Sequence, residues 1–137
     1  MQSDNQAYEK IVSSYYEAKN LGEYLELLSK SYHDDEMKRY GESKISQRYL
    51  NAEKFFEGAL KDIELGSLQI IRVEVISSTK VIVHVNAEIV RKGETNVNST
   101  LFPLIFERGH WLIAMAPLPD SPSALLNIRK RMQDIGN

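Results

Sequence analysis

The hydrophobic pattern changes within residues 63–76, IELGSLQIIRVEVI. Before the Leu65-Gly66 step, apolar residues recur every three or four positions, which is the spacing of one face of a helix. From Leu68 to Pro117 they alternate with polar residues or run continuously, which is typical of strands. A helical half followed by one run of strands predicts an α+β fold.

The length and composition favour one ordinary globular domain over residues 1–137. A net charge of −2 gives no general attraction to nucleic acid or to anionic membranes. The chain has no cysteine, and no apolar run reaches the roughly 18 residues that a membrane-spanning helix needs. We therefore expect no nucleic-acid partner, no membrane span, no bound metal and no cofactor. The polar start indicates a cytoplasmic protein if Met1 is native, or an exported one if a leader has been removed.

Three helices are predicted before the sheet. The first begins at Asp4, because Ser3 and Gln6 have the spacing of a capping box. The second covers about residues 23–31, and the third runs from about Ser43 to a stop at Gly66. A polar loop at residues 32–36 separates the last two. The apolar stripe of the first helix is Tyr8, Ile11, Val12, Tyr15 and Tyr16, and that of the third is Ile45, Tyr49, Ala52, Phe56, Ala59, Leu60 and Ile63.

Four strands are predicted at about 68–76, 80–91, 96–107 and 110–117. The short connections between them require antiparallel neighbours. A last helix is expected over about residues 121–135, capped by Ser121 with Pro122 in its first turn. The expected architecture is thus three N-terminal helices packed on a curved antiparallel four-stranded sheet, plus a C-terminal helix.

The faces of the strands separate core from surface. Alternation places Ile71, Val73 and Val75 on one face of the first strand. In the second strand, one face carries Val81, Val83, Val85, Ala87 and Ile89, while the other carries Ile82, His84, Asn86, Glu88 and Val90. The last two strands are apolar on both faces, so their outer face needs either the C-terminal helix or a second subunit. We predict a homodimer interface there, made by Leu101, Ile105, Leu112, His84 and Asn86.

Several segments resemble the NTF2-like superfamily, whose cone-shaped, cystatin-like α+β fold includes nuclear transport factor 2, ketosteroid isomerase and polyketide-cyclase-like (SnoaL-like) proteins. The matching segments are Tyr8–Ser31 with its Asn20-Leu21-Gly22-Glu23 break, Asp34-Asp35, and Glu107-Arg108-Gly109-His110-Trp111-Leu112-Ile113. The resemblance covers about residues 4–117 and implies a pocket between helices and sheet, together with dimerisation through the sheet. The enzymes of the superfamily place carboxylates, His or Tyr on inward strand positions, whereas those positions are apolar here.

Candidate chemistry is sparse. His33-Asp34-Asp35-Glu36 can supply a general base or metal ligands, but we interpret it as a solvated loop. Tyrosines are numerous, and Tyr15, Tyr16 and Tyr49, with His33, are the predicted ligand-binding residues. The run Arg129-Lys130-Arg131 is too short to form a basic face.

The leading hypothesis is a non-catalytic binding or assembly module for a protein partner or a small apolar ligand, with no catalytic residue assigned. The alternative is a small isomerase-like or cyclase-like enzyme that uses His33, Asp34 or a helix tyrosine. A third possibility is the soluble domain of an exported or envelope protein.

Overall fold

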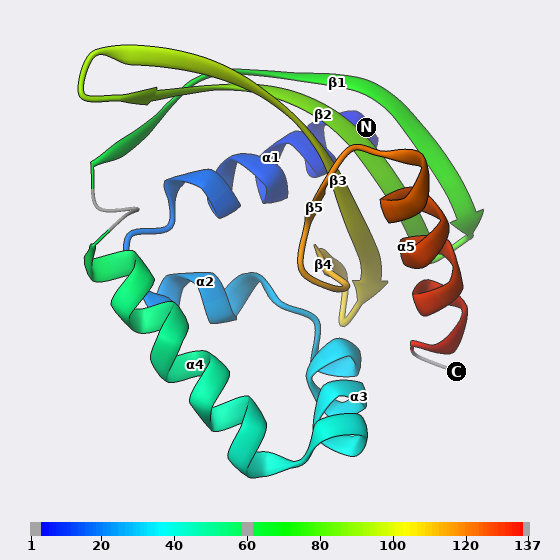
Figure 1. Cartoon of the computed structure of the whole chain (residues 1–137). Coiled ribbons are helices and arrows are strands. Elements are labelled where there is room, and N and C mark those ends of the chain that lie inside the picture. Colours follow the sequence, from blue (N-terminus) through cyan, green and yellow to red (C-terminus); the bar gives the residue numbers. More distant parts are fainter. Residues whose placement is uncertain (1–3, 59–61, 136–137) are drawn as a thin grey trace.

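The computed structural model describes residues 4–58 and 62–135. Its helices are α1 (Asp4–Glu17), α2 (Leu21–Leu27), α3 (Lys30–Tyr40), α4 (Glu42–Glu57) and α5 (Pro122–Asp134). Its strands are β1 (Ile63–Ser77), β2 (Lys80–Arg91), β3 (Glu94–Glu107), β4 (His110–Ile113) and β5 (Leu118–Pro119). They form one antiparallel sheet in the order β1-β2-β3-β4, with β5 paired to β3 (Figure 1). The predicted α+β architecture with an antiparallel sheet is confirmed.

The helical half differs from the prediction, because within the described residues four helices precede the sheet. The polar stretch expected to be a loop lies in α3. Ser29 caps this helix by accepting a hydrogen bond from the Tyr32 N–H at 2.9 Å. The Glu107 carboxylate, 77 residues away, accepts a second bond from the Lys30 N–H at 2.6 Å. Gly41, with φ +84°, then ends the helix.

The change from helix to strand comes earlier than predicted. The α4 helix ends at Glu57, and Gly66 lies inside β1 instead of stopping a helix. A register shift between Leu65 and Ser67 makes Gly66 a bulge. A Cβ at Gly66 would lie 3.3 Å from Val90 Cγ2, so a small residue suits this close approach. Three residues of the predicted helical stripes and caps, Ser3, Ala59 and Leu60, lie outside the described residues.

The inner face of the sheet carries the core. Alternating β2 residues pack with Phe102 and Leu104 of β3 and with Tyr8, Ile11 and Val12 of α1, as predicted for this strand. The predicted core face of β1 fails at two of its three residues. Val75 is 70% exposed near the end of the strand, and a second bulge lies between Ile70 and Arg72. The bulge leaves Ile71 53% exposed, while Ile70 and Val73 pack against the core.

The outer face of the sheet is covered within the chain by α5, which lies across it (Figure 1). Ile128, Met132 and Ile135 pack on Ile82, Leu101 and Ile105, and all six side chains are buried. Arg129 of α5 binds the Glu74 carboxylate of β1 through two hydrogen bonds of 2.6 and 2.5 Å. The C-terminal helix, one of the two covers considered for this face, therefore occupies the apolar surface on which the homodimer hypothesis rested.

Candidate functional site

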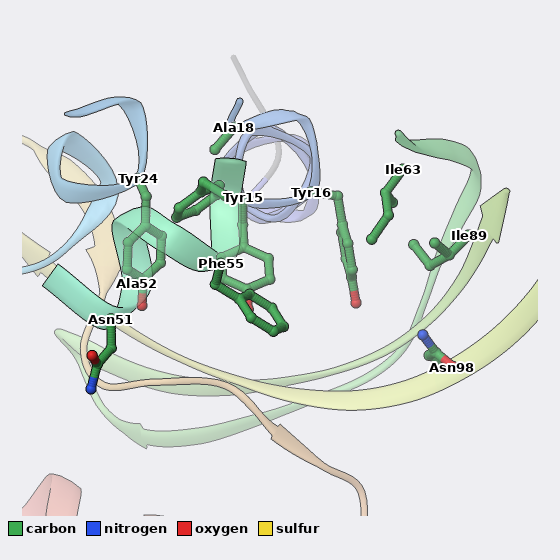
Figure 2. A pocket seen from close by; sticks show the side chains of 11 residues that line it. Tyr15, Tyr16, Ala18, Tyr24, Asn51, Ala52, Phe55, Ile63, Ile89 and Asn98 are labelled. Carbon is green, nitrogen blue, oxygen red and sulfur yellow. The ribbon is translucent and has the colours of Figure 1, made fainter. Parts of the chain in front are cut away.

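A cavity of about 510 Å³ lies between the helices and the inner face of the sheet. Tyr15 and Tyr16 project into it from α1, and Tyr24 does so from α2 (Figure 2). Aromatic and aliphatic side chains supply most of the remaining wall, which comes from α4, β1 and β2: Ala52, Phe55, Phe56, Ile63 and Ile89. The walls are therefore mainly hydrophobic, as is usual for small-molecule sites.

The two α1 tyrosines are held by ring contacts. Tyr15 and Tyr16 each meet the buried Phe102 ring edge-on, with centroids 5.2 and 5.7 Å apart, and Tyr15 also packs edge-on against Tyr24. Consecutive positions on a helix point about 100° apart, so adjacent tyrosines spread along the cavity wall. The hydroxyls of both residues lie toward the sheet in Figure 2. These edge-on contacts position the rings that form this part of the wall.

The cavity is electrically neutral. No Asp, Glu, Lys, Arg or His is among the described residues that line it. Burial raises the pKa of Tyr15 and Tyr16 above the ordinary value, and it raises the pKa of Tyr24 to about 12. The phenols therefore stay protonated at neutral pH, and each can donate one hydrogen bond. The other polar groups are the carboxamides of Asn51 and Asn98, which lie on opposite sides of the tyrosines (Figure 2).

The other two predicted ligand-binding residues lie in a second, smaller cavity between α2, α3 and α4. His33 Nδ1 is 2.7 Å from the hydroxyl oxygen of Tyr49, and the two rings stack at a centroid distance of 6.0 Å. This cavity measures about 130 Å³ and shares Tyr24 and Ala52 with the larger one. The four predicted ligand-binding residues are thus divided between two cavities that share Tyr24. Tyr15 and Tyr16 line the larger one, and His33 and Tyr49 line the smaller one.

The acidic cluster on α3 is divided by the helix into different environments. Asp34 is exposed and pairs with Lys30 at 2.8 Å. Glu36 is buried and binds Arg48 of α4 at 3.1 Å and Arg131 of α5 at 3.2 Å. Arg131 also pairs with Asp35. These carboxylates join three helices, so the cluster is not the solvated loop expected from the sequence. No group of three or more His, Asp or Glu within residues 4–58 and 62–135 has the arrangement of a metal site.

The residues predicted to form a dimer interface occupy different environments. Leu101 and Ile105 are buried under α5, and His84 is only 6% exposed. Leu112 is half-buried, and Asn86 accepts a hydrogen bond from the Ser99 hydroxyl at 2.7 Å. Dimerisation through this face stays a prediction, because no second chain is present.

Sequence reasoning missed part of the cavity lining. Tyr24 was not among the tyrosines predicted to bind a ligand, and Phe55 was not singled out, although it is adjacent to Phe56 of the predicted apolar stripe. Asn51 and Asn98 were not predicted, because α4 and β3 contribute to one cavity only in the folded chain. No helix among the described residues combines the length and the hydrophobicity required to cross a membrane.

No protein-family model matches the sequence, and no curated protein matches it at a significant level. A solved domain of unknown function with a cystatin-like fold, from Nostoc punctiforme, is similar at 11% identity and a TM-score of 0.54. The alignment covers 97% of this chain and 85% of that one. The intermembrane space region of the chloroplast protein ARC6 aligns at 15% identity and a TM-score of 0.48, over 88% of this chain and 100% of that one. The first similarity supports a cystatin-like α+β fold, the class to which the NTF2-like cone belongs, and no finer assignment.

Proposed function

We propose that the domain is a non-catalytic binding module that holds a small, neutral, largely apolar molecule in the tyrosine-lined cavity. The proposal rests on the volume of the cavity together with the absence of charged side chains among its described lining residues. A volume of about 510 Å³ falls in the range of about 300–1,000 Å³ that ligand sites occupy. A charged group that entered this cavity would lose hydration without meeting a counter-charge, which is costly.

The polar groups of the cavity favour a ligand with hydrogen-bonding atoms at its ends. The hydroxyls of Tyr15 and Tyr16 can donate to a carbonyl or ether oxygen, since both phenols stay protonated. The carboxamides of Asn51 and Asn98 can donate and accept on opposite sides of the tyrosines. Between these groups, aromatic rings offer faces and edges suited to a flat hydrocarbon or aromatic body.

The alternative function is an enzyme that uses His33 as a general base, and its support is the hydrogen bond between His33 Nδ1 and the Tyr49 hydroxyl, 2.7 Å apart. The second cavity disfavours it, because its volume of about 130 Å³ lies below the range of about 300–1,000 Å³ that ligand sites occupy. Non-catalytic binding therefore remains the better-supported proposal.

A pair of fluorescent probes tests the proposal. N-phenyl-1-naphthylamine is neutral, and 8-anilino-1-naphthalenesulfonate has the same ring system with an added sulfonate. We expect the neutral probe to show a saturable, blue-shifted emission and to bind at least about tenfold more tightly than the anionic probe. Equal or tighter binding of the sulfonate in the cavity would contradict the proposed neutrality of the site.

Cavity-filling substitutions locate the binding. Asn98→Phe places a ring in the cavity from β3, and Val97→Phe adds the same ring at the adjacent position, whose side chain is 63% exposed. Ala52→Phe and the exposed Glu53→Phe form a second matched pair on α4. We expect Asn98→Phe and Ala52→Phe to abolish binding of the neutral probe, and the two controls to retain it. Unchanged binding in both cavity variants would reject this site.

A further inference from the structure

A second hollow lies on the outer face of the sheet, on the opposite side from the tyrosine-lined cavity. It measures about 520 Å³ and lies between β1, β2 and the beginning of α5. Two facing residues of the β1–β2 pair, Arg72 and His84, line it. Arg72 Nη2 lies 3.1 Å from His84 Nε2.

The direction of this hydrogen bond determines which nitrogen of the His84 imidazole carries the proton. A guanidinium can only donate, so His84 Nε2 must accept and therefore carries no proton. The ring proton then lies on Nδ1, which faces Asp120 Oδ2 at 3.5 Å. Because His84 is only 6% exposed, the buried neutral ring holds the guanidinium in one position without cancelling its charge.

Arg72 differs from two other arginines of the outer face in its lack of a close carboxylate partner. Arg129 and Arg131 each form close ion pairs with carboxylates. Within residues 4–58 and 62–135, no carboxylate lies within ion-pair distance of Arg72. Glu74, two residues along β1, attracts Arg72 only at longer range, because both of its oxygens are bound by Arg129. Among the described residues, the hollow therefore holds a cation positioned by a ring nitrogen and without a close ion pair, and the carboxylate that lines the same hollow, Asp120, contacts the other ring nitrogen.

The bulge in β1 adds an apolar surface next to this cation. It leaves Ile71 beside Arg72, 53% exposed, at the edge of the same hollow. Leu125 and Pro122, at the beginning of α5, supply the facing apolar wall. Bulges commonly redirect side chains next to functional sites, and a large exposed aliphatic residue beside a cation suits an amphipathic ligand.

We propose that this hollow binds a small organic monocarboxylate. The carboxylate pairs with the guanidinium of Arg72, whose planar fork matches two oxygens, and a short hydrocarbon chain lies against Ile71 and Leu125. Asp120 lies on the Nδ1 side of the imidazole, away from Arg72, and disfavours a second negative charge in the ligand. This site is independent of the neutral cavity, from which it is separated by the sheet.

Methyl NMR on the full chain tests the proposal with hexanoate as the probe, and with hexanol and hexylamine as matched uncharged and cationic molecules. We expect hexanoate to shift the methyl signals of Ile71 and Leu125 saturably, and the other two molecules to leave them unchanged. Arg72→Gln should weaken hexanoate binding about tenfold or more, as expected for loss of a charged hydrogen bond. Arg108→Gln, at the exposed β3–β4 turn, should leave it unchanged.

A second variant separates the apolar contact from folding. Ile71→Ser changes an exposed side chain, so the fold should be retained, and it should weaken hexanoate binding while leaving acetate binding unchanged. The proposal is overturned by the absence of a saturable shift, by hexanol binding as well as hexanoate, or by unchanged hexanoate affinity in folded Arg72→Gln. None of these outcomes bears on the binding of N-phenyl-1-naphthylamine in the tyrosine-lined cavity.

Discussion

The Glu36→Gln substitution tests how the helical half is attached to the rest of the domain. Glu36 accepts from Arg48 at 3.1 Å and from Arg131 at 3.2 Å, and its side chain is only 12% exposed. A glutamine has nearly the same shape but no charge, and its NH2 group would face one of the two guanidinium donors. The variant therefore leaves a partly buried cation without its partner.

The magnitude follows from the exposure of the partners. Removing one member of a buried ion pair costs about 3–5 kcal/mol. The cost here is lower, because the Arg48 side chain is 45% exposed and Arg131 keeps Asp35. We expect a loss of about 2–3 kcal/mol in the free energy of unfolding. With a urea dependence of about 1–3 kcal/mol per molar, the unfolding midpoint should fall by about 1 M.

Urea unfolding followed by circular dichroism measures this loss, and Asp34→Asn is the matched control. Asp34 lies on the same helix and pairs with Lys30, but both side chains are more than half exposed. We expect its midpoint to match that of the unchanged chain, since exposed pairs contribute little. Equal midpoints for Glu36→Gln and Asp34→Asn would refute the reasoning and would restore the interpretation of residues 33–36 as a solvated cluster.

Further substitutions give three more predictions. Burial raises the pKa of Tyr24 to about 12, so this tyrosine ionises more readily in the unfolded chain, and the free energy of unfolding should fall between about pH 10 and about pH 12. The same alkaline loss in a Tyr24→Phe variant would contradict this prediction. Arg129 lowers the pKa of Glu74, so the stability that this pair contributes should be lost as the pH falls below 4.5. In melting temperatures measured across this pH range, Glu74→Gln should reduce the decrease seen at acidic pH. The buried Lys80 ammonium donates to the Met132 carbonyl at 2.7 Å, so Lys80→Met should cost about 1–2 kcal/mol in urea unfolding, and an unchanged midpoint would count against this anchor of α5.

Strand β2 shows what the sequence predicts well. Its alternating valines identify the inner face because every second residue of an unbulged strand points the same way. In β1 the same rule assigned Ile71 to the face of Val73, and the bulge moved it away. A bulge depends on the partner strand, so the pattern within β1 alone does not reveal it.

Helix α3 shows what the sequence predicts poorly. Its polar composition resembles that of a loop, and the contacts that stabilise it are distant in sequence: Glu107 at its beginning and Arg131 beside Glu36. The same limit applies to the candidate site. Tyr15 and Tyr16 were predicted from their position on an apolar helix, whereas Asn98 of β3 lines the cavity only because the fold brings β3 opposite the helices.

We expect the tyrosine-lined cavity to accept a neutral apolar molecule. Isotope-filtered NOESY spectra of the chain with labelled isoleucine methyls and bound N-phenyl-1-naphthylamine test it most directly. We predict cross-peaks from the probe to the methyls of Ile63 and Ile89, which line the cavity. Cross-peaks to Ile82 and Ile128 beneath α5 instead, or saturable binding without contact to Ile63 and Ile89, would contradict it.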